Sequence, residues 1–339
     1  MPRVLAILLF ILLSFPASSQ EDERLLLIGN SYTFCNDLPG VIQAIANADR
    51  YPLEVDSYTA GAMSLRGFLN SPEHSQATRK LASGGYKWVL LQDQSQTPSA
   101  RPDETLASVR QWTQLARKHS TRPILFLTWA HAAQENNRLV LQAPMQDDTS
   151  LTYCRAAVEN KIRVAPVGEA WRRWYSKYPT TPLHTNDLSH PTPEGTYLAA
   201  CVIYCTITGK VATSLPIRLK NSPVHIPAAQ ARQLQKIAAA TLKGFSPAQY
   251  LHRHEQKEQQ LLSAEDVRAQ LTADMSISTL IKLLGKPAFV QKTPQQHSYQ
   301  FRLRNRTELV AYCTPRGKIR QISIASPTER VQIIDMSQL

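Results

Sequence analysis

The stretch Leu25–Ser31, which reads LLLIGNS, decides the fold of this chain. A short apolar run that ends at Gly29 is typical of a strand buried on both faces, and Ser31 would lie just past its carboxyl end. Far downstream, Asp187 and His190 stand three residues apart in the stretch DLSH, just before a predicted helix. These residues are the minimum set of a nucleophile, a general base and a carboxylate that orients the base. Together the two stretches predict a hydrolase that uses a serine nucleophile.

Between residue 25 and about residue 245, short apolar runs alternate with segments of helical periodicity. The predicted strands are Leu25–Ile28, Leu53–Ser57, Tyr86–Leu91, Ile124–Thr128 and Ile162–Pro166. The predicted helices are Gly40–Asp49, His74–Ser83, Asp103–His119, Ser150–Asn160, a helix from Thr192-Pro193 to Gly209, and Ala228–Leu242. This alternation favours a parallel sheet with helices on both faces, and ligands bind such sheets at the carboxyl ends of the strands.

The composition changes after the last of these helices, which predicts several parts for the chain. Residues 246–262 are polar and are predicted to form a linker or a solvated helix. Residues 263–339 are predicted to form a small α+β domain, with a helix at Ser278–Leu284, three alternating strands and a hairpin turn at Arg316-Gly317. The expected organisation is a signal peptide (1–19), a large α/β domain (20–245), a polar linker (246–262) and a small domain (263–339).

The N-terminus has the pattern of a processing signal. Arg3 precedes the apolar run Val4–Phe15, and small residues at 17–19 form a cleavage site near Ser19. The run is short for a membrane span, so an uncleaved anchor is the weaker alternative. No later stretch has the roughly 20 apolar residues of a transmembrane helix. The sequence therefore predicts a secreted or periplasmic protein with no stable membrane span after cleavage.

Charge and cysteine content argue against a nucleic-acid-binding protein and against a disulfide-rich protein. The formal net charge is +12, but the cations are spread along the chain without a long basic run, which argues against nucleic-acid binding. An exported basic protein is better suited to anionic envelope polymers or acidic glycans. Five cysteines are too few and too scattered for a disulfide framework, although one pair could be oxidised after export.

The segment that contains Asp187 and His190 is also compatible with a metal site. His184 extends it to His-x-x-Asp-x-x-His, and two histidines with one carboxylate are a known facial set of metal ligands. A metal-dependent hydrolase that uses His184, Asp187 and His190 is therefore an alternative. It ranks second because no glutamate stands beside either histidine, as in helical zinc-protease motifs. In the serine hypothesis, His184 lines the substrate pocket.

Four blocks of sequence resemble the SGNH (GDSL-type) hydrolases in the right order. They are Gly29-Asn30-Ser31-Tyr32-Thr33, Ala60-Gly61-Ala62, Leu91-Gln92-Asp93-Gln94-Ser95 and Asp187-x-x-His190. The resemblance implies a flavodoxin-like three-layer sandwich with a five-stranded parallel sheet, and ester hydrolysis without a metal or organic cofactor. It also implies an oxyanion hole made of the Ser31 N–H, the Gly61 N–H and a side-chain amide.

The chain departs from the family pattern at three positions. Asn30 replaces the usual aspartate of the first block, Gln92 replaces a glycine, and Gln94 stands where asparagine is usual. Gln94 is the predicted amide donor of the oxyanion hole. Gln92 and Trp129 are predicted to line the substrate site with His184, and Trp129 would either stack against a sugar ring or belong to the core.

The predicted substrate is a short acyl ester, most simply an acetyl group, on a carbohydrate or another small molecule. The small domain more loosely resembles the lipoprotein-type domains of outer-membrane assembly factors, through Ser276–Pro287, Tyr299-x-Phe301 and Arg316-Gly317-Lys318. That resemblance implies docking to an envelope partner. The rival function is a non-catalytic envelope protein that binds glycans on a degraded hydrolase fold.

Overall fold

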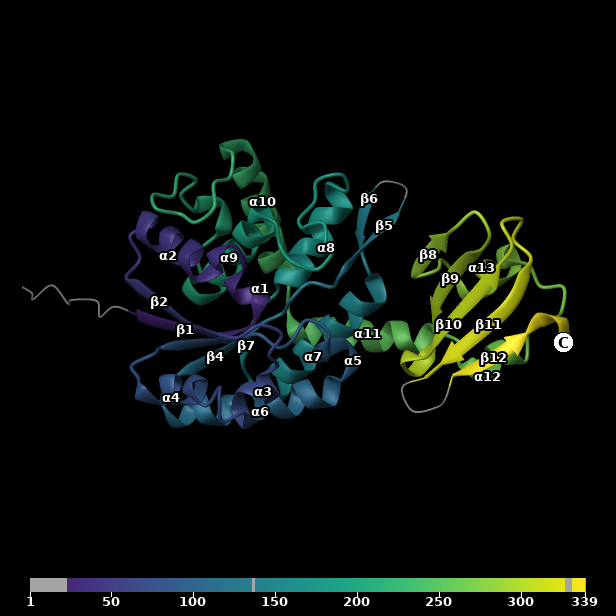
Figure 1. The fold of residues 1–339 in the computed structure, drawn as a ribbon, viewed down its shortest axis with the longest axis horizontal. Helices are drawn as coiled ribbons and strands as arrows, with labels where there is room; N and C mark the ends of the chain where they lie inside the picture. Colours follow the sequence, from purple (N-terminus) through teal and green to yellow (C-terminus); the bar gives the residue numbers. More distant parts are fainter. Residues whose placement is uncertain (1–22, 136–137, 327–330, 339) are drawn as a thin grey trace, which may run out of the picture.

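A computed structural model describes residues 23–135, 138–326 and 331–338. The predicted signal peptide lies outside the described residues. Within the described residues the strands form two five-stranded sheets and one two-stranded hairpin (Figure 1). None of the helices in this part of the chain is both long and apolar enough to cross a membrane.

The first sheet is entirely parallel and has the strand order β2-β1-β3-β4-β7. Its strands are β1 (Glu23–Gly29), β2 (Leu53–Thr59), β3 (Trp88–Leu91), β4 (Arg122–Phe126) and β7 (Arg163–Ala165). In β1, Leu25 and Leu27 pack into one core cluster, whereas Leu26 and Ile28 pack into another. Burial on both faces explains the uninterrupted apolar run, and the predicted five-stranded parallel sheet is confirmed.

Helices cover both faces of this sheet and make three layers (Figure 1). One face carries α2 (Leu38–Ala48), α8 (Val167–Lys177), α9 (Pro193–Thr208) and α10 (Ala228–Gly244). The other carries α3 (Leu65–Asn70), α4 (Gln76–Ser83), α6 (Pro102–Lys118) and α7 (Ala143–Asn160). Two short helices, α1 (Ser31–Phe34) and α5 (Thr97–Ala100), are single turns that follow β1 and β3.

Local signals explain where α9 begins and ends. The Thr192 hydroxyl accepts a hydrogen bond from the Gly195 N–H at 3.2 Å, and Pro193 occupies the first helical turn. Gly209 ends the helix with a φ of 74°, which a residue with a side chain adopts less readily. Cys201 and Cys205 of this helix are buried, and all five cysteines of the chain are free thiols.

Two elements near the sheet edge were not predicted. A hairpin of β5 (Ala132–Glu135) and β6 (Arg138–Leu141) follows the fourth strand, and α8 fills the stretch after the fifth. The buried face of α8 carries Trp171 and Trp174, which join the core beneath the sheet edge. Together with the loop 178–192, these elements surround the carboxyl end of β4.

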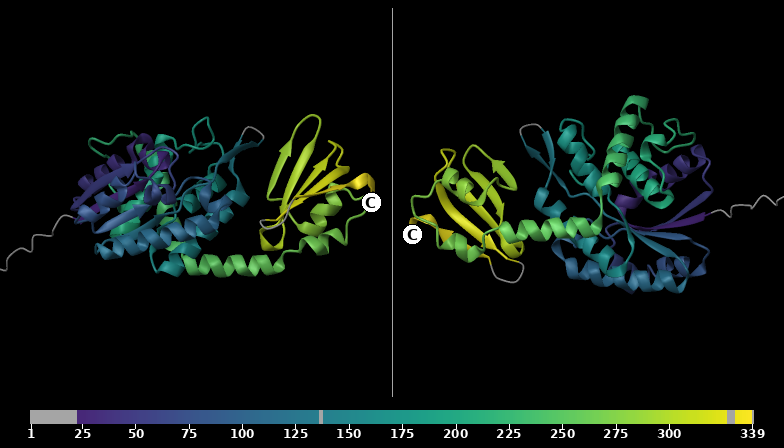
Figure 2. Two further views of the ribbon diagram at one scale, coloured as in Figure 1. Left: turned by 60° about the horizontal axis from the view of Figure 1, so that its bottom comes forward. Right: turned by 180° about the vertical axis from the view of Figure 1, so that it is seen from behind.

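The predicted polar linker is a helix, α11 (Pro247–Gln260) (Figure 2). Ser246 caps its N-terminus, and Tyr250 and Leu251 pack onto the core beside α7. Beyond α11 lie α12 (Ala264–Arg268), α13 (Ile277–Leu284) and an antiparallel sheet in the order β12-β11-β10-β9-β8. Its strands are β8 (Phe289–Lys292), β9 (His297–Arg302), β10 (Glu308–Cys313), β11 (Ile319–Ala325) and β12 (Gln332–Asp335).

This second unit, which we call the C-terminal domain, has a core of its own. The buried residues of that core come from positions 267–336, and α12 and α13 cover one face of the sheet. Gly317, in the predicted turn between β10 and β11, has a φ of 86°. Arg302 of β9 forms ion pairs with the large-domain side: it bonds Asp148 of α7 at 2.7 Å and approaches Glu258 of α11 at 3.7 Å. Whether this domain docks an envelope partner stays a prediction.

Candidate active site

Ser31 stands at the carboxyl end of β1, where the chain turns directly from strand into helix α1. The turn is tight at Gly29, because a Cβ atom there would collide with the Thr33 hydroxyl and the Gln92 amide oxygen. Asn30 caps α1 by accepting from the Tyr32 N–H at 3.1 Å. Its amide nitrogen donates to the Met63 carbonyl at 3.0 Å. This bond connects the turn that carries Ser31, which we call the serine turn, to the loop after β2.

Ser31, His190 and Asp187 form a continuous hydrogen-bonded relay. The Ser31 Oγ lies 2.9 Å from His190 Nε2, and His190 Nδ1 lies 2.6 Å from Asp187 Oδ2. Because a carboxylate only accepts hydrogen bonds, Nδ1 carries the ring proton in the neutral imidazole and Nε2 is free to accept from the serine hydroxyl. This is the tautomer that a general base needs. The structure thus brings together the three residues that the sequence predicted as catalytic.

The Asp187 carboxylate is held by more than the imidazole. Its Oδ1 accepts from the backbone N–H groups of Ser189 and His190, both at 2.9 Å, and from the Thr185 hydroxyl at 2.8 Å. Desolvation alone would raise the pKa of Asp187, but the hydrogen bonds outweigh it and keep this pKa far below its usual range. The carboxylate therefore stays charged beside His190 and stabilises a protonated imidazole.

Gln92 does not line the substrate site as predicted. Its side chain is fully buried, and its Oε1 accepts from the Asn30 N–H at 2.8 Å and the Thr33 hydroxyl at 2.9 Å. Its amide nitrogen donates to Asn30 Oδ1 at 3.0 Å and to the Asp93 carbonyl. Gln92 therefore uses its hydrogen-bonding atoms to hold the serine turn against the end of β3.

Trp129 is also buried, so the prediction that it lines the substrate site is wrong and its core alternative holds. Its ring is stacked between Tyr32 at 4.5 Å and Trp171 at 4.0 Å, measured between ring centroids. Its Nε1 donates to the Ser189 carbonyl at 2.9 Å. Trp129 thus supports the loop that carries His190 from below.

Tyr32 completes this support, a role that the sequence did not predict. Its hydroxyl lies 2.8 Å from Ser189 Oγ and within hydrogen-bonding reach of Ser95, and its ring meets the His190 ring edge-on. Burial raises the pKa of Tyr32 to about 12, so the hydroxyl keeps its proton at neutral pH. Its position next to Ser31 in the sequence was the only available signal.

His184 neither lines a pocket nor joins the relay. Its Nε2 faces the Ala130 carbonyl at 3.0 Å, so this nitrogen carries the proton, and its Nδ1 accepts from the Tyr175 hydroxyl at 2.8 Å. Burial lowers the pKa of His184 to about 4. Because both ring nitrogens are occupied, His184 cannot complete a metal site with Asp187 and His190. The residues that the structure describes contain no group of three or more His, Cys, Asp or Glu side chains that could hold a metal ion.

The predicted oxyanion-hole groups lie on neighbouring strand ends. Gly61 is exposed in the turn after β2, and the Ser31 N–H belongs to the first turn of α1, where helix N–H groups lack intrahelical acceptors. The Gln94 Oε1 accepts from the Gln96 and Thr97 N–H groups at 2.8 and 3.1 Å, which anchors the amide at the start of α5. Its nitrogen donates only a long bond, 3.3 Å, to Ser95 Oγ. The role of these groups stays a prediction.

No protein-family model and no curated protein matches this chain. Among solved structures, it is similar to a DUF4886 family protein from Bacteroides uniformis, with 17% identity and a TM-score of 0.53 over 66% of this chain and 95% of the other. It is also similar to a candidate SGNH hydrolase from Slackia heliotrinireducens, with 23% identity and a TM-score of 0.47 over 55% of this chain and 100% of the other.

A third similar structure is an acetyl-xylooligosaccharide esterase from Geobacillus stearothermophilus, in a mutant form. It has 15% identity and a TM-score of 0.46 over 56% of this chain and 95% of the other. At such identities the likeness is one of fold, and it leads to a single conclusion: the large domain has the three-layer α/β fold of the Bacteroides uniformis protein.

Proposed function

We propose that this chain is a serine esterase that hydrolyses a short acyl ester, most simply an acetyl group on a carbohydrate. The observation that carries the proposal is the relay from Ser31 through His190 to Asp187, with hydrogen bonds of 2.9 and 2.6 Å. The imidazole tautomer set by Asp187 is the one that can take the serine proton. About a third of the His190 side chain is exposed, so a substrate can reach the relay.

In the first half of the reaction, the Ser31 oxygen attacks the acyl carbonyl carbon while its proton passes to His190 Nε2. The resulting imidazolium is stabilised by the charged Asp187. The negative oxygen of the tetrahedral intermediate accepts from the N–H groups of Ser31 and Gly61 and from the Gln94 amide. The bond to the leaving alcohol then breaks, and that alcohol takes the proton from Nε2.

In the second half, water attacks the acyl group on Ser31 and gives a proton to His190. The bond between the Ser31 oxygen and the acyl carbon breaks, and Ser31 regains its proton as the acid leaves. Besides the ester and one water molecule, these steps use only groups of the chain itself.

We also propose that the protein acts outside the cytoplasm after cleavage near Ser19. The support is the basic and apolar pattern of residues 3–19, followed by the acidic stretch Glu21-Asp22-Glu23. N-terminal sequencing of the protein recovered from the periplasm, the medium and the membrane fraction tests this proposal. A retained Met1 would contradict it and support the anchor alternative.

The esterase proposal is tested by hydrolysis of p-nitrophenyl acetate, first by the wild-type protein and then by Ser31→Ala. We expect kcat/KM to fall by at least about 10⁴-fold in the variant. Ser83→Ala is the matched control, because Ser83 is exposed at the end of α4 and bonds only the Lys80 carbonyl. A fluorophosphonate should label the wild type and the control, but not Ser31→Ala.

Two results would contradict the proposal in different ways. A folded wild type with no activity towards acetyl esters would favour the glycan-binding alternative. Activity that survives Ser31→Ala but is lost on treatment with a chelator would show a metal-dependent mechanism instead. If the serine mechanism holds, a screen of acetylated glycans identifies the alcohol part of the substrate.

A further inference from the structure

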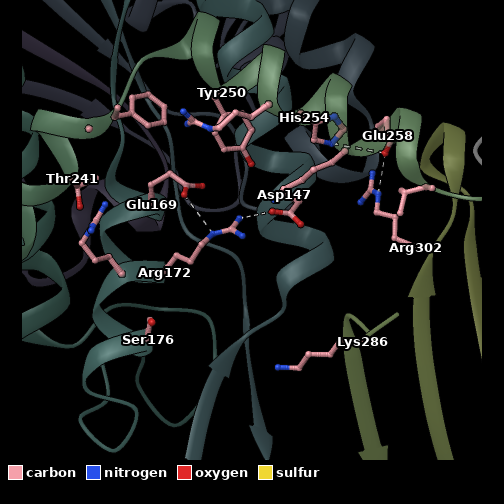
Figure 3. Close-up of a pocket in the computed structure, with 16 residues that line it drawn as sticks. Asp147, Glu169, Arg172, Ser176, Thr241, Tyr250, His254, Glu258, Lys286 and Arg302 are labelled. Atoms are coloured by element: carbon pink, nitrogen blue, oxygen red, sulfur yellow. Dashed lines mark ion pairs between the residues drawn. The ribbon is translucent and has the colours of Figure 1, made fainter. Parts of the chain in front are cut away.

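A cavity of about 760 Å³ lies between helices of the large domain and the C-terminal domain (Figure 3). Its lining includes none of the relay residues. The size is within the range of small-molecule sites, roughly 300 to 1,000 Å³. The cationic side chains in its wall come from α8, α11 and the C-terminal domain: Arg172, Arg173, Arg253, Lys257, Lys286 and Arg302.

Positive charge is in excess in this cavity. Six cationic side chains line it, against the three carboxylates of Asp147, Glu169 and Glu258. Asp148, just outside the lining, pairs with Arg302 at 2.7 Å, so an excess of two positive charges is left. His254 also lines the cavity, but burial lowers its pKa, so it is neutral at pH 7 and does not change this balance.

The carboxylates are already used by two of the arginines (Figure 3). Arg172 bonds Asp147 at 2.7 Å and approaches Glu169 at 3.4 Å, and Arg302 approaches Glu258 at 3.7 Å. The other four cations, Arg173, Arg253, Lys257 and Lys286, have no ion-pair partner among the described residues. They come from α8, from α11 and from the loop after α13, and they line one space, so no single neighbouring carboxylate neutralises them.

Arg302 also has unused donors. Its side chain is only 13% exposed, and its Nη1 is buried without a hydrogen-bond partner in the described structure. A buried guanidinium N–H without a partner is unfavourable, because the group has lost its water. An oxyanion in the cavity would supply the missing acceptor.

We infer that this cavity binds a small polyanion that carries carboxylate or phosphate groups. Arginine forks and lysine ammonium groups suit both kinds of group, and several cations in one cavity favour more than one negative charge on the ligand. Lys286 and Arg302 belong to the C-terminal domain, Arg172 and Arg173 belong to the large domain, and Arg253 and Lys257 lie on α11, which packs on the large domain. The ligand therefore bridges the two domains. This inference does not rest on the esterase proposal.

The test is isothermal titration of the full chain with inorganic pyrophosphate and, separately, with citrate at low ionic strength. We expect binding that weakens as salt is added, because salt screens the charges. In the double variant Lys257→Gln/Lys286→Gln, affinity should fall by at least about tenfold, since two charge-assisted contacts are lost. Both lysines are exposed, so the variant is expected to fold.

The matched control is Lys236→Gln/Lys282→Gln. These lysines are exposed on α10 and α13, do not line the cavity, and their loss changes the net charge by the same amount. Stronger binding of pyrophosphate points to a phosphate-bearing ligand, and stronger binding of citrate points to a carboxylate-bearing ligand. If the folded protein binds neither pyrophosphate nor citrate, the inference is overturned. Equal affinities in the two double variants would also overturn it.

Discussion

The exposed relay and the buried layer beneath it contain the same kinds of side chain but use them in opposite ways. His190 and His184 stand six residues apart in one loop. His190 is 37% exposed and has one nitrogen towards a carboxylate and the other towards a serine. His184 is 2% exposed and has one nitrogen towards a backbone carbonyl and the other towards a tyrosine hydroxyl. The partners of each ring, rather than the residue type, decide its role.

The difference shows how chemistry and orientation are divided at this edge of the sheet. The exposed layer presents a base whose second nitrogen faces the nucleophile. The buried layer fixes the loop that carries the base, through Trp129 to the Ser189 carbonyl and through Tyr32 to the Ser189 hydroxyl. Changes in the exposed layer should therefore reduce the rate with little effect on folding, whereas changes in the buried layer should affect folding or orientation.

The largest effect is expected from His190→Ala. Without a base the serine keeps its proton, so kcat should fall by about 10⁴-fold or more. The thermal unfolding temperature should change little, because the ring is partly exposed and its bonds serve the relay. Ester hydrolysis and thermal unfolding, measured beside His252→Ala on the exposed face of α11, check both points. A large loss of stability in His190→Ala would contradict the division of roles.

A somewhat smaller loss is expected from Asp187→Asn. The amide can present its NH₂ group to His190 Nδ1 and so favour the wrong tautomer, which lowers kcat by about 10³- to 10⁴-fold. Asparagine keeps one oxygen for the backbone N–H groups of Ser189 and His190, so the loop should hold. Hydrolysis rates of Asp187→Asn are compared with those of Thr185→Val, which removes one hydrogen-bond donor to the Asp187 carboxylate but keeps its charge. The comparison separates the effect of the carboxylate charge from the effect of loop geometry. Equal losses in both variants would mean that only loop geometry matters.

The fold and the relay could be predicted from sequence because each leaves a local pattern. A strand buried on both faces has the uninterrupted run seen in Leu25–Ile28, and Asp187 with His190 occupies a loop where no helix cap explains them. The predicted substrate-lining role failed for Gln92, Trp129 and His184, since burial depends on residues brought together by tertiary packing. No local pattern shows that Trp129 stacks on Trp171 or that His184 bonds Tyr175.

The pH dependence of folding distinguishes the buried histidine from the exposed one. The pKa of His184 is about 4 in the folded protein and about 6.5 in an unperturbed chain, so the unfolded state binds a proton that the folded state excludes. The contribution that neutral His184 makes to the free energy of unfolding is fully present above pH 6.5. It is lost as the pH falls towards 4, by an amount on the order of 3 kcal/mol.

Urea unfolding between pH 7 and 4 measures this slope, and His184→Phe should flatten it. The variant should also lose about 1 to 3 kcal/mol at pH 7, because the Ala130 carbonyl and the Tyr175 hydroxyl lose their partner. His252→Phe on the exposed face of α11 is the matched control. An unchanged slope in His184→Phe would show that His184 does not carry this part of the acid sensitivity.

The smallest effect is expected from Tyr32→Phe, which tests whether the buried layer orients the base. The variant keeps the stacking on Trp129 but loses the bond to Ser189 Oγ, so kcat should fall about three- to tenfold. Tyr86→Phe removes a hydroxyl that bonds Asp56 instead, and it should leave kcat unchanged.

The double variant Tyr32→Phe/Ser189→Ala makes the last comparison decisive. If the hydroxyl acts through Ser189, the double variant should be no slower than Tyr32→Phe alone, because the same bond is already absent. Additive losses would mean that Tyr32 affects the rate by another route, such as its edge-on contact with the His190 ring. The relay would then depend on the buried layer through packing of the Tyr32 ring against His190 rather than through the hydrogen bond from Tyr32 to Ser189.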